Sequence, residues 1–311
     1  MSDVPQEPDA PEEAGGPHLE NVEVPVVDPP PEPTSAEPLD PRWWGEVTLA
    51  PGGVARLRAG PSTVHVERRT SDWRVWHEGG ADAYAVVAER VHALDDGAPE
   101  GKPTLRFSFA ESPDTLHVRP RLADRPVVVR PETPLVVPPG ETVTLYASTP
   151  VWMAIKFEVR RTRRGRAHAT DLAVVAELPT ARPTDTWYGP NTREGELCYA
   201  VRTAARTEVA DLPLRPHRAV TAVTVENQAA TPLALVRIAV PMPFLALHVD
   251  PDGRLWTDRV RFVHQSDGDT TVEAQPAAPT GGTLLAEPRD APTLTQTLSR
   301  TVSRLFKVDV R

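Results

Sequence analysis

Apolar and polar residues alternate with a period of two along much of the chain, a pattern that indicates β-strands rather than helices. It is clearest at residues 151–159, where every second residue from Val151 is apolar and the other face carries Lys156 and Glu158. We expect a half-buried strand there. The same alternation predicts strands at 63–68, 72–77, 104–109, 115–118, 141–147, 195–202, 220–226, 233–240, 244–249 and 259–265.

Turn signals separate these stretches and point to a fold class. Pro51-Gly52, Pro139-Gly140 and Asp252-Gly253 are typical turn dipeptides. The 36 prolines in 311 residues argue against long helices, because proline lacks the N–H that a helix interior needs. We therefore predict a mainly β protein with two tandem antiparallel β-sandwich-like domains, at residues 41–130 and 131–275.

A weak internal repeat supports the idea that the two predicted domains are duplicates. Pro51-Gly52 recurs 88 residues later as Pro139-Gly140, and the sequence AVVAE at 85–89 recurs at 173–177 with the same offset. Ala and Val are common in this chain, so chance similarity is the alternative. The duplication is a hypothesis that the pairing of strands can test.

The acidity of the chain belongs to its first 40 residues. Residues 1–40 hold eleven Asp and Glu, ten prolines and no Lys or Arg, whereas the rest of the chain has 32 acidic and 34 basic residues. The net charge of −9 therefore predicts neither a nucleic-acid partner nor an acid-adapted surface. We expect this acidic tail to be disordered, because it has little apolar surface to bury.

The pattern changes near the C-terminus. After a Pro- and Gly-rich linker at 276–292, residues 293–308 have apolar residues at helical spacing and basic residues toward the end, where cations suit the helix dipole. This amphipathic helix docks on its own domain, on a protein partner or on an anionic membrane, and the three interpretations stay open; because the helix is short, we expect membrane association to be weak or indirect. The expected docking residues are Leu294, Leu298, Val302, Leu305 and Phe306.

Several classes of site have no signature in the sequence. Cys198 is the only cysteine, so there is no intramolecular disulfide and no CxxC zinc motif. The nine histidines show no metal-ligand spacing, and no glycine motif for nucleotides is present. We expect no metal and no cofactor. With neither a signal-peptide pattern nor an apolar stretch long enough to cross a membrane, we expect a cytoplasmic protein.

The densest group of uncommon residues lies at 183–200. In the strand predicted at 195–202, Leu197 and Tyr199 share the expected core face with Val201, and Cys198 points the other way. Cys198 is a candidate nucleophile if a neighbouring base lowers its pKa. The simpler interpretation is a small residue packed between layers.

The segment before that strand, which we expect to be a loop, holds a candidate binding surface. Asp185, Trp187 and Tyr188 combine a carboxylate with two aromatic rings, a set suited to a sugar, a cation or a protein partner. The alternative is a loop anchor, in which Trp187 closes the end of the sandwich and Asp185 caps the turn.

The strongest run of positive charge follows the strand at 151–159. Its glycine predicts a hairpin tip or loop, where arginines bind phosphate or an acidic partner. Nucleic acid is not expected as a partner, because no aromatic residues for base stacking are interleaved. A solvated loop is the simplest alternative, and the acidic tail folded onto the loop is another. The run consists of Arg160, Arg161, Arg163, Arg164 and Arg166.

Four motifs together resemble an uncharacterised family, domain-of-unknown-function family 432, found mainly in archaea with bacterial members. They are Thr149-Pro-Val-Trp152, Asp185-Thr-Trp-Tyr-Gly189, Gly195-Glu-Leu-Cys-Tyr-Ala200 and Asp252-Gly-Arg-Leu-Trp-Thr257. The resemblance covers roughly residues 41–265 and implies no activity. It implies that members are sometimes encoded beside small-conductance mechanosensitive channels, which favours a membrane protein as partner of the C-terminal helix or the arginine run.

Taken together, these patterns favour a non-catalytic binding or adaptor protein over an enzyme. The expected partner surfaces are the segment around Trp187, the arginine run and the C-terminal helix. The alternative is a small-molecule enzyme that uses Cys198 or a nearby acid, although the sequence does not assemble a complete catalytic set.

Overall fold

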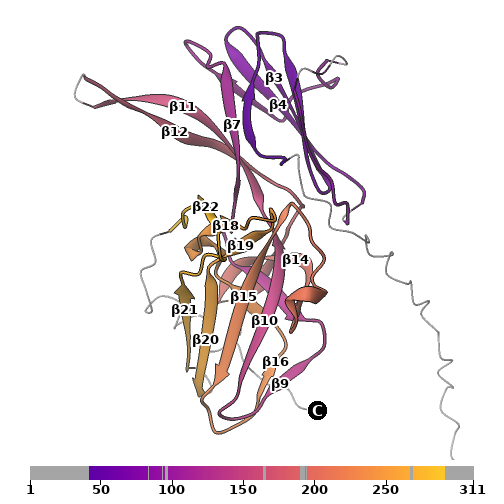
Figure 1. The fold of residues 1–311 in the computed structure, drawn as a ribbon, viewed down its shortest axis with the longest axis vertical. Helices are drawn as coiled ribbons and strands as arrows, with labels where there is room; N and C mark the ends of the chain where they lie inside the picture. Colours follow the sequence, from indigo (N-terminus) through magenta and orange to yellow (C-terminus); the bar gives the residue numbers. More distant parts are fainter. Residues whose placement is uncertain are drawn as a thin grey trace, which may run out of the picture. The chain divides into compact units, whose positions relative to one another are not determined.

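Strands form nearly all of the regular structure in the computed structural model (Figure 1), which describes residues 42–82, 84–92, 94, 97–163, 166–189, 193, 195–266 and 269–290. The regular helical segments in this part of the chain are two 3₁₀ turns, η1 (Val209–Asp211) and η2 (Met242–Phe244). The mainly β fold with several antiparallel sheets is thereby confirmed. The helix predicted at 293–308 and the acidic tail at 1–40 lie outside the described residues.

The first sheet has five antiparallel strands in the order β5-β2-β3-β4-β6. Their bounds are β2 (Val54–Ala59), β3 (Ser62–Arg68), β4 (Asp72–Gly79), β5 (Ala88–Val91) and β6 (Leu105–Ser108). Alternating burial along β2 and β3 matches the alternation of their sequences, because one face of the sheet packs on the core.

The second sheet has four antiparallel strands in the order β1-β7-β11-β12, and Figure 1 shows its last two strands as one long hairpin. Its strands are β1 (Gly45–Thr48), β7 (Thr115–Arg121), β11 (Trp152–Arg163) and β12 (Arg166–Pro179). The first half of β11 is buried on both faces, whereas the prediction gave it one exposed face. Trp152 lies on the face that was expected to be exposed, and its ring packs against the ring of Tyr199, a residue of the eleven-stranded sheet, with the centroids 5.5 Å apart.

The third sheet has eleven strands, most of them short, and it supplies much of the described core. β10, β15, β20 and β21 run side by side in Figure 1. The strands are β8 (Val127–Pro131), β10 (Thr142–Pro150), β13 (Thr184–Tyr188), β14 (Glu196–Arg206), β15 (Arg218–Asn227), β17 (Ile238–Val240), β18 (Leu247–Val249), β19 (Leu255–Thr257), β20 (Arg259–Ser266), β21 (Asp269–Gln275) and β22 (Thr283–Ala286).

Two predicted elements differ from the structure. The stretch 233–240 is two strands and not one, because β16 (Leu233–Leu235) leaves the third sheet to pair with β9 (Leu135–Val137), whereas β17 pairs with β8. Between them Val236 is 60% exposed. The segment at 184–188, expected to be a loop, is the strand β13, which pairs with β14.

The sheets do not divide at residue 130. β11 pairs with β7, so residues 152–179 share a sheet with strands from the first part of the chain. β8, from the first part, belongs to the eleven-stranded sheet. The repeated AVVAE segments also have different partners, since residue Ala88 of the first pairs with β2 whereas the second lies in β12 and pairs with β11. The two-sandwich division and the duplication therefore stay predictions.

One close contact fixes the first sheet against the segment that leads into β15. Gly60, in the turn between β2 and β3, has a φ of +57°, and a Cβ there would lie 2.3 Å from the ring of His217. The indole Nε1 of Trp43 donates a hydrogen bond to the carbonyl of Pro216 at 2.9 Å. Both Trp43 and His217 are completely buried. A glycine is therefore required at the turn for space as well as for backbone conformation.

We predict that Phe157→Ala lowers the free energy of unfolding by about 3–5 kcal/mol, because the fully buried ring leaves a cavity when removed. The ring lies 4.9 Å from Phe109 and 5.6 Å from Trp73. Urea denaturation is the measurement. Val175→Ala, at a partly exposed position on β12, is the matched control and should cost less than about 1 kcal/mol. Equal losses would contradict the placement of Phe157 in the core.

His217 should make the protein sensitive to acid. Burial lowers the pKa of its ring to about 3 from 6.5, with Arg218 and Arg215 contributing. The folded pKa is depressed, so its contribution is complete above about pH 6.5 and is lost as the pH falls toward 3. We predict a loss of up to about 1.4 kcal/mol per pH unit in this window. Urea midpoints at pH 7, 6 and 5 should fall less steeply for His217→Gln than for the unmodified protein, and identical slopes would refute the assignment.

Candidate functional site

A cleft of about 740 Å³ is the candidate site, a volume typical of small-ligand pockets. One wall comes from the turn before β3, the end of β4 and the segment after it. The other wall comes from the ends of β10 and β12, the middle of β14 and the segment that leads into β15. The Gly60–His217 contact holds these walls together, because Pro61 follows the glycine and Arg218 follows the histidine.

Four arginines line this cleft, and no Asp or Glu does so among the described residues. Arg182 and Arg202 are exposed at its edge, Arg215 is half-buried, and Arg218 is buried. In the part of the chain that the structure describes, none of the four guanidinium groups forms an ion pair with a carboxylate. We call these four residues and their surroundings the arginine cleft.

Arg218 is a buried cation held by neutral groups. Its Nε donates to the Ser148 hydroxyl at 3.2 Å, and one Nη donates to the carbonyls of Ser148 and Arg202. Burial, with a further contribution from Arg215, lowers the pKa of Arg218 to about 10. The side chain is therefore still charged at neutral pH. A buried charge without a counter-ion is costly, so an anion in the cleft would be stabilised strongly.

Arg215 also carries a positive charge that forms no ion pair among the described residues. Its guanidinium lies over the ring of Tyr84, with the carbon 5.2 Å from the ring centroid, a cation–π contact. Its Nε is buried and forms no hydrogen bond with any of the described residues. Burial lowers the pKa of Arg215, an effect opposed by Tyr84 and Asp82. The buried Nε atoms of Arg56 and Arg68 also have no partner among the described residues, so it is the position of Arg215 in the cleft that makes its donor relevant to a ligand.

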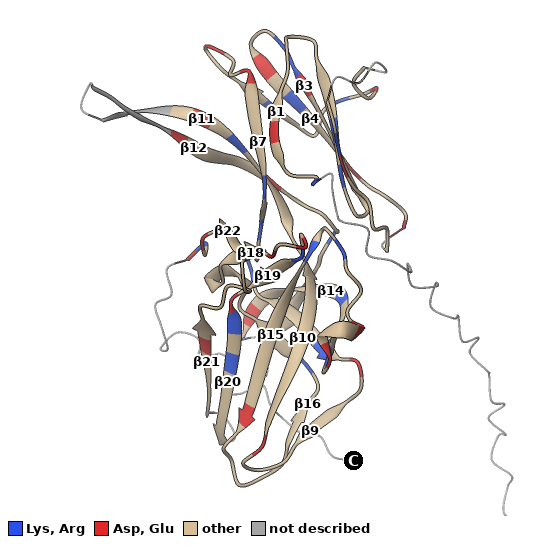
Figure 2. Cartoon of the chain, viewed as in Figure 1, with Lys and Arg blue, Asp and Glu red and all other residues tan. Residues whose placement is uncertain are grey.

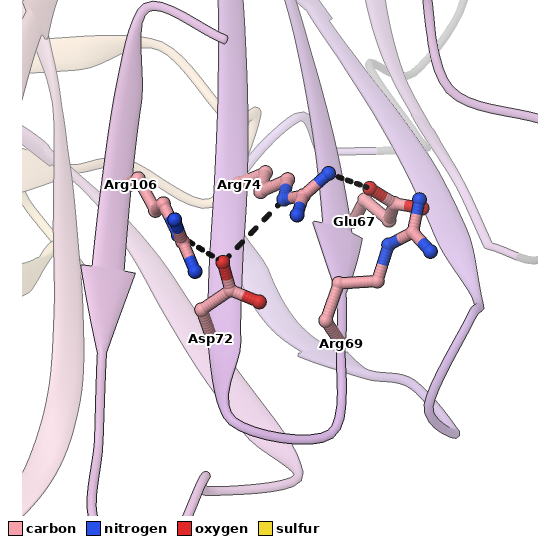
Figure 3. Close-up of polar contacts among 5 residues, drawn as sticks. All are labelled: Glu67, Arg69, Asp72, Arg74 and Arg106. Carbon is pink, nitrogen blue, oxygen red and sulfur yellow. Dashed lines mark hydrogen bonds and ion pairs between the residues drawn. The ribbon is translucent and has the colours of Figure 1, made fainter.

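In a second group of arginines, outside the cleft, the guanidinium groups form ion pairs with buried carboxylates (Figure 3). There Asp72 accepts from Arg74 at 3.4 Å and pairs with Arg106, and Glu67 pairs with Arg69 at 2.7 Å. Both carboxylates are buried, and their arginine partners lie on β4, on β6 and in the β3–β4 turn. These ion pairs join neighbouring strands, and one Glu67 oxygen has no hydrogen bond within the described residues.

Charged residues elsewhere are mixed in sign. Lys and Arg are interspersed with Asp and Glu along the described strands (Figure 2). Typical surface pairs are Arg56 with Glu89 at 2.7 Å and Arg261 with Glu273 at 3.3 Å. The arginine cleft differs from this background because four arginines gather there and, among the described residues, none forms an ion pair; Asp82 acts on Arg215 through its charge alone.

The three residues predicted around Trp187 are separated by the alternation of β13. Asp185 and Trp187 are on the exposed face, whereas Tyr188 is buried and donates to the Arg237 carbonyl at 3.2 Å. Asp185 pairs with Arg125 at 3.1 Å, and Arg125 lies over the ring of Tyr199. Tyr188 is therefore not available to a ligand on the face that Asp185 and Trp187 share.

The expected orientation of β14 was wrong at its first residues. Leu197 is 43% exposed, whereas Cys198 is completely buried with Tyr188, Ala239 and Val128. Val128 and Ala239, on β8 and β17, cover the face that was expected to point outward. Burial, with Glu196 adding to the effect, raises the pKa of the Cys198 thiol to about 12. The thiol is protonated at neutral pH, and this environment does not favour a nucleophile.

The remaining predicted sites have different outcomes. Arg160–Arg163 end β11 and Arg166 begins β12, with Arg163 opposite Arg166, so this run flanks the tip of the hairpin. Arg164 lies outside the described residues, as do the helix residues Leu294, Leu298, Val302, Leu305 and Phe306.

Within the described ranges, no set of three His, Cys, Asp or Glu side chains is placed to hold a metal ion. No described helix is long and apolar enough to cross a membrane.

We predict that Cys198 in the folded protein reacts with iodoacetamide at pH 7.5 on the order of 1,000-fold more slowly than free cysteine, because the thiolate fraction falls with the raised pKa. The rate is measured by mass spectrometry. In 6 M guanidinium chloride the same thiol should react at the rate of free cysteine. Rapid labelling of the folded protein would restore Cys198 as a candidate nucleophile.

Comparison with known proteins gives a family but no activity. The family model described as "Protein of unknown function (DUF432)" matches residues 43–306, which extends beyond the four motifs that suggested the resemblance. No curated protein and no solved structure gives a significant match. Because the match covers most of the 311 residues, the chain belongs to the DUF432 family.

Proposed function

We propose that this protein is a binding module whose arginine cleft takes an anionic ligand with phosphate or carboxylate groups. The observation that carries the proposal is the set of four arginines without a carboxylate partner in one cleft, among the residues that the structure describes. Guanidinium groups bind such anions through paired, charge-assisted hydrogen bonds.

The arrangement of the four arginines suits a ligand that enters from solvent. Arg182 and Arg202 at the edge attract an anion, and Arg215 and Arg218 meet it where water is scarce. Tyr84, which is 54% exposed, adds an aromatic surface beside Arg215. A ligand with an anionic group and a flat or apolar part therefore fits better than a free halide ion.

A second candidate function is the docking of a protein partner, as expected for an adaptor. The observation in its favour is the pair Trp187 and Leu197, which lie opposite each other on β13 and β14 and are 42% and 43% exposed. Large apolar side chains exposed side by side are a common feature of interaction surfaces. The channel partner implied by family context stays an expectation of this second proposal.

We predict that the protein binds inorganic phosphate or citrate, and that Arg202→Gln weakens the binding about 10- to 100-fold through the loss of charge-assisted hydrogen bonds. Isothermal titration calorimetry at low salt is the measurement. Arg202 is exposed at the cleft edge, so its replacement should leave the melting temperature nearly unchanged.

Two variants serve as controls for the calorimetry. Arg130→Gln removes an exposed arginine outside the cleft, and Trp187→Ala changes the surface of the second candidate function. Both should bind the anion as the unmodified protein does. The proposal fails if neither anion binds, or if Arg130→Gln weakens binding as much as Arg202→Gln.

A further inference from the structure

A serine and a histidine lie together inside the arginine cleft. Ser62 begins β3 and His77 lies near the end of β4, and both line the cleft. The register pairs His77 with Val64, so Ser62 is its diagonal neighbour on the same side of the sheet. The Ser62 Oγ is 2.9 Å from the His77 Nε2, a hydrogen-bond distance.

The direction of this hydrogen bond follows from the other side of the imidazole ring. The backbone of Pro179 acts on the ring and raises the pKa of His77, against the larger effect of burial. Proline has no N–H, so the group that favours a protonated ring nitrogen there is the Pro179 carbonyl. Because Nε2 faces Ser62, we assign the proton of the neutral ring to Nδ1, which leaves Nε2 unprotonated. In this tautomer the Ser62 hydroxyl donates to Nε2, as the nucleophile does in a serine–histidine pair.

The protonation state of the histidine suits this role. Burial lowers the pKa of His77, and the Pro179 backbone partly offsets the effect. The charged groups that line the cleft with it are the four arginines, which carry the same sign as a protonated imidazole. At neutral pH the ring is therefore neutral and able to accept a proton.

We propose that the arginine cleft is a hydrolytic site, in which Ser62 and His77 cleave a carboxylic ester that also carries a phosphate or carboxylate group. This inference rests on the anion binding proposed above and extends it from binding to catalysis. Ser62 is 2% exposed, and it lines the cleft, so the cleft is the route by which an ester reaches its hydroxyl. The arginines hold the anionic group and stabilise the negative charge that develops on the carbonyl oxygen.

The reaction balances with water as the only co-substrate. The Ser62 Oγ attacks the ester carbonyl carbon while its proton passes to the His77 Nε2. The bond between that carbon and the alcohol oxygen breaks, and His77 returns the proton to the departing alcohol. Water, activated by the same nitrogen, then attacks the acyl group on Ser62 and releases the carboxylic acid.

We predict that an alkyl fluorophosphonate labels Ser62, and that His77→Gln slows labelling at least tenfold because the base is lost. Peptide mass spectrometry identifies the labelled residue. Ser62→Ala should abolish the label, whereas Ser108→Ala and His92→Gln, both at exposed positions outside the cleft, should label as the unmodified protein does. Melting temperatures confirm that each variant is folded, and His77→Gln tests the pair even if Ser62→Ala is unstable.

Hydrolysis of two esters tests the anionic part of the substrate. 4-Acetoxybenzoate should be cleaved with a kcat/KM at least tenfold above that of phenyl acetate, and Arg202→Gln should reduce this preference. Labelling at another serine would overturn the inference, and so would labelling that His77→Gln does not slow. It would also be overturned if the unmodified protein and Arg202→Gln each cleaved the two esters with equal kcat/KM. Phosphate binding without Ser62 labelling would overturn the catalytic inference alone, whereas Ser62 labelling without phosphate binding would overturn the proposed anion site.

Discussion

The packing of one turn against one imidazole ring determines where the rest of the cleft can be. Gly60 approaches the ring of His217 more closely than any side chain would allow, and the buried indole of Trp43 is bonded to the neighbouring Pro216. Pro61 and Ser62 follow the glycine on one wall, and Arg218 follows the histidine on the other. Neither ring nitrogen of His217 has a hydrogen-bond partner among the described residues, and burial keeps the ring neutral at neutral pH.

The protein uses arginine in two physically different ways. Around Asp72 and Glu67, carboxylates taken out of water are matched by guanidinium groups, so the desolvation cost is offset inside the fold. In the arginine cleft the positive charges are left to neutral carbonyls, a hydroxyl and an aromatic ring. The first arrangement stabilises the sheet. The second is the basis of the anion site proposed above, because an anion would supply the counter-charge that these neutral groups do not.

Sequence patterns predicted most strands but not the site. Alternation located β3, β4, β10, β11 and β15, because one face of each strand or part of it meets the core. It failed at Cys198, since strands distant in the sequence cover the face that looked external. The cleft residues have no common motif, because Ser62, His77, Pro179 and Arg218 meet only through hairpin register and the contact at Gly60. A search for local signatures cannot detect such a set.

The hydrogen bond between the Trp43 indole and the Pro216 carbonyl also affects how the chain folds during synthesis on the ribosome. Its two residues are 173 positions apart, so the first sheet emerges long before the segment that covers it. At about 5–20 residues per second, the delay is roughly 10–35 s. During that time Trp43 and the β2–β3 turn have no His217 to pack against. The nascent chain therefore exposes apolar surface that a chaperone would recognise.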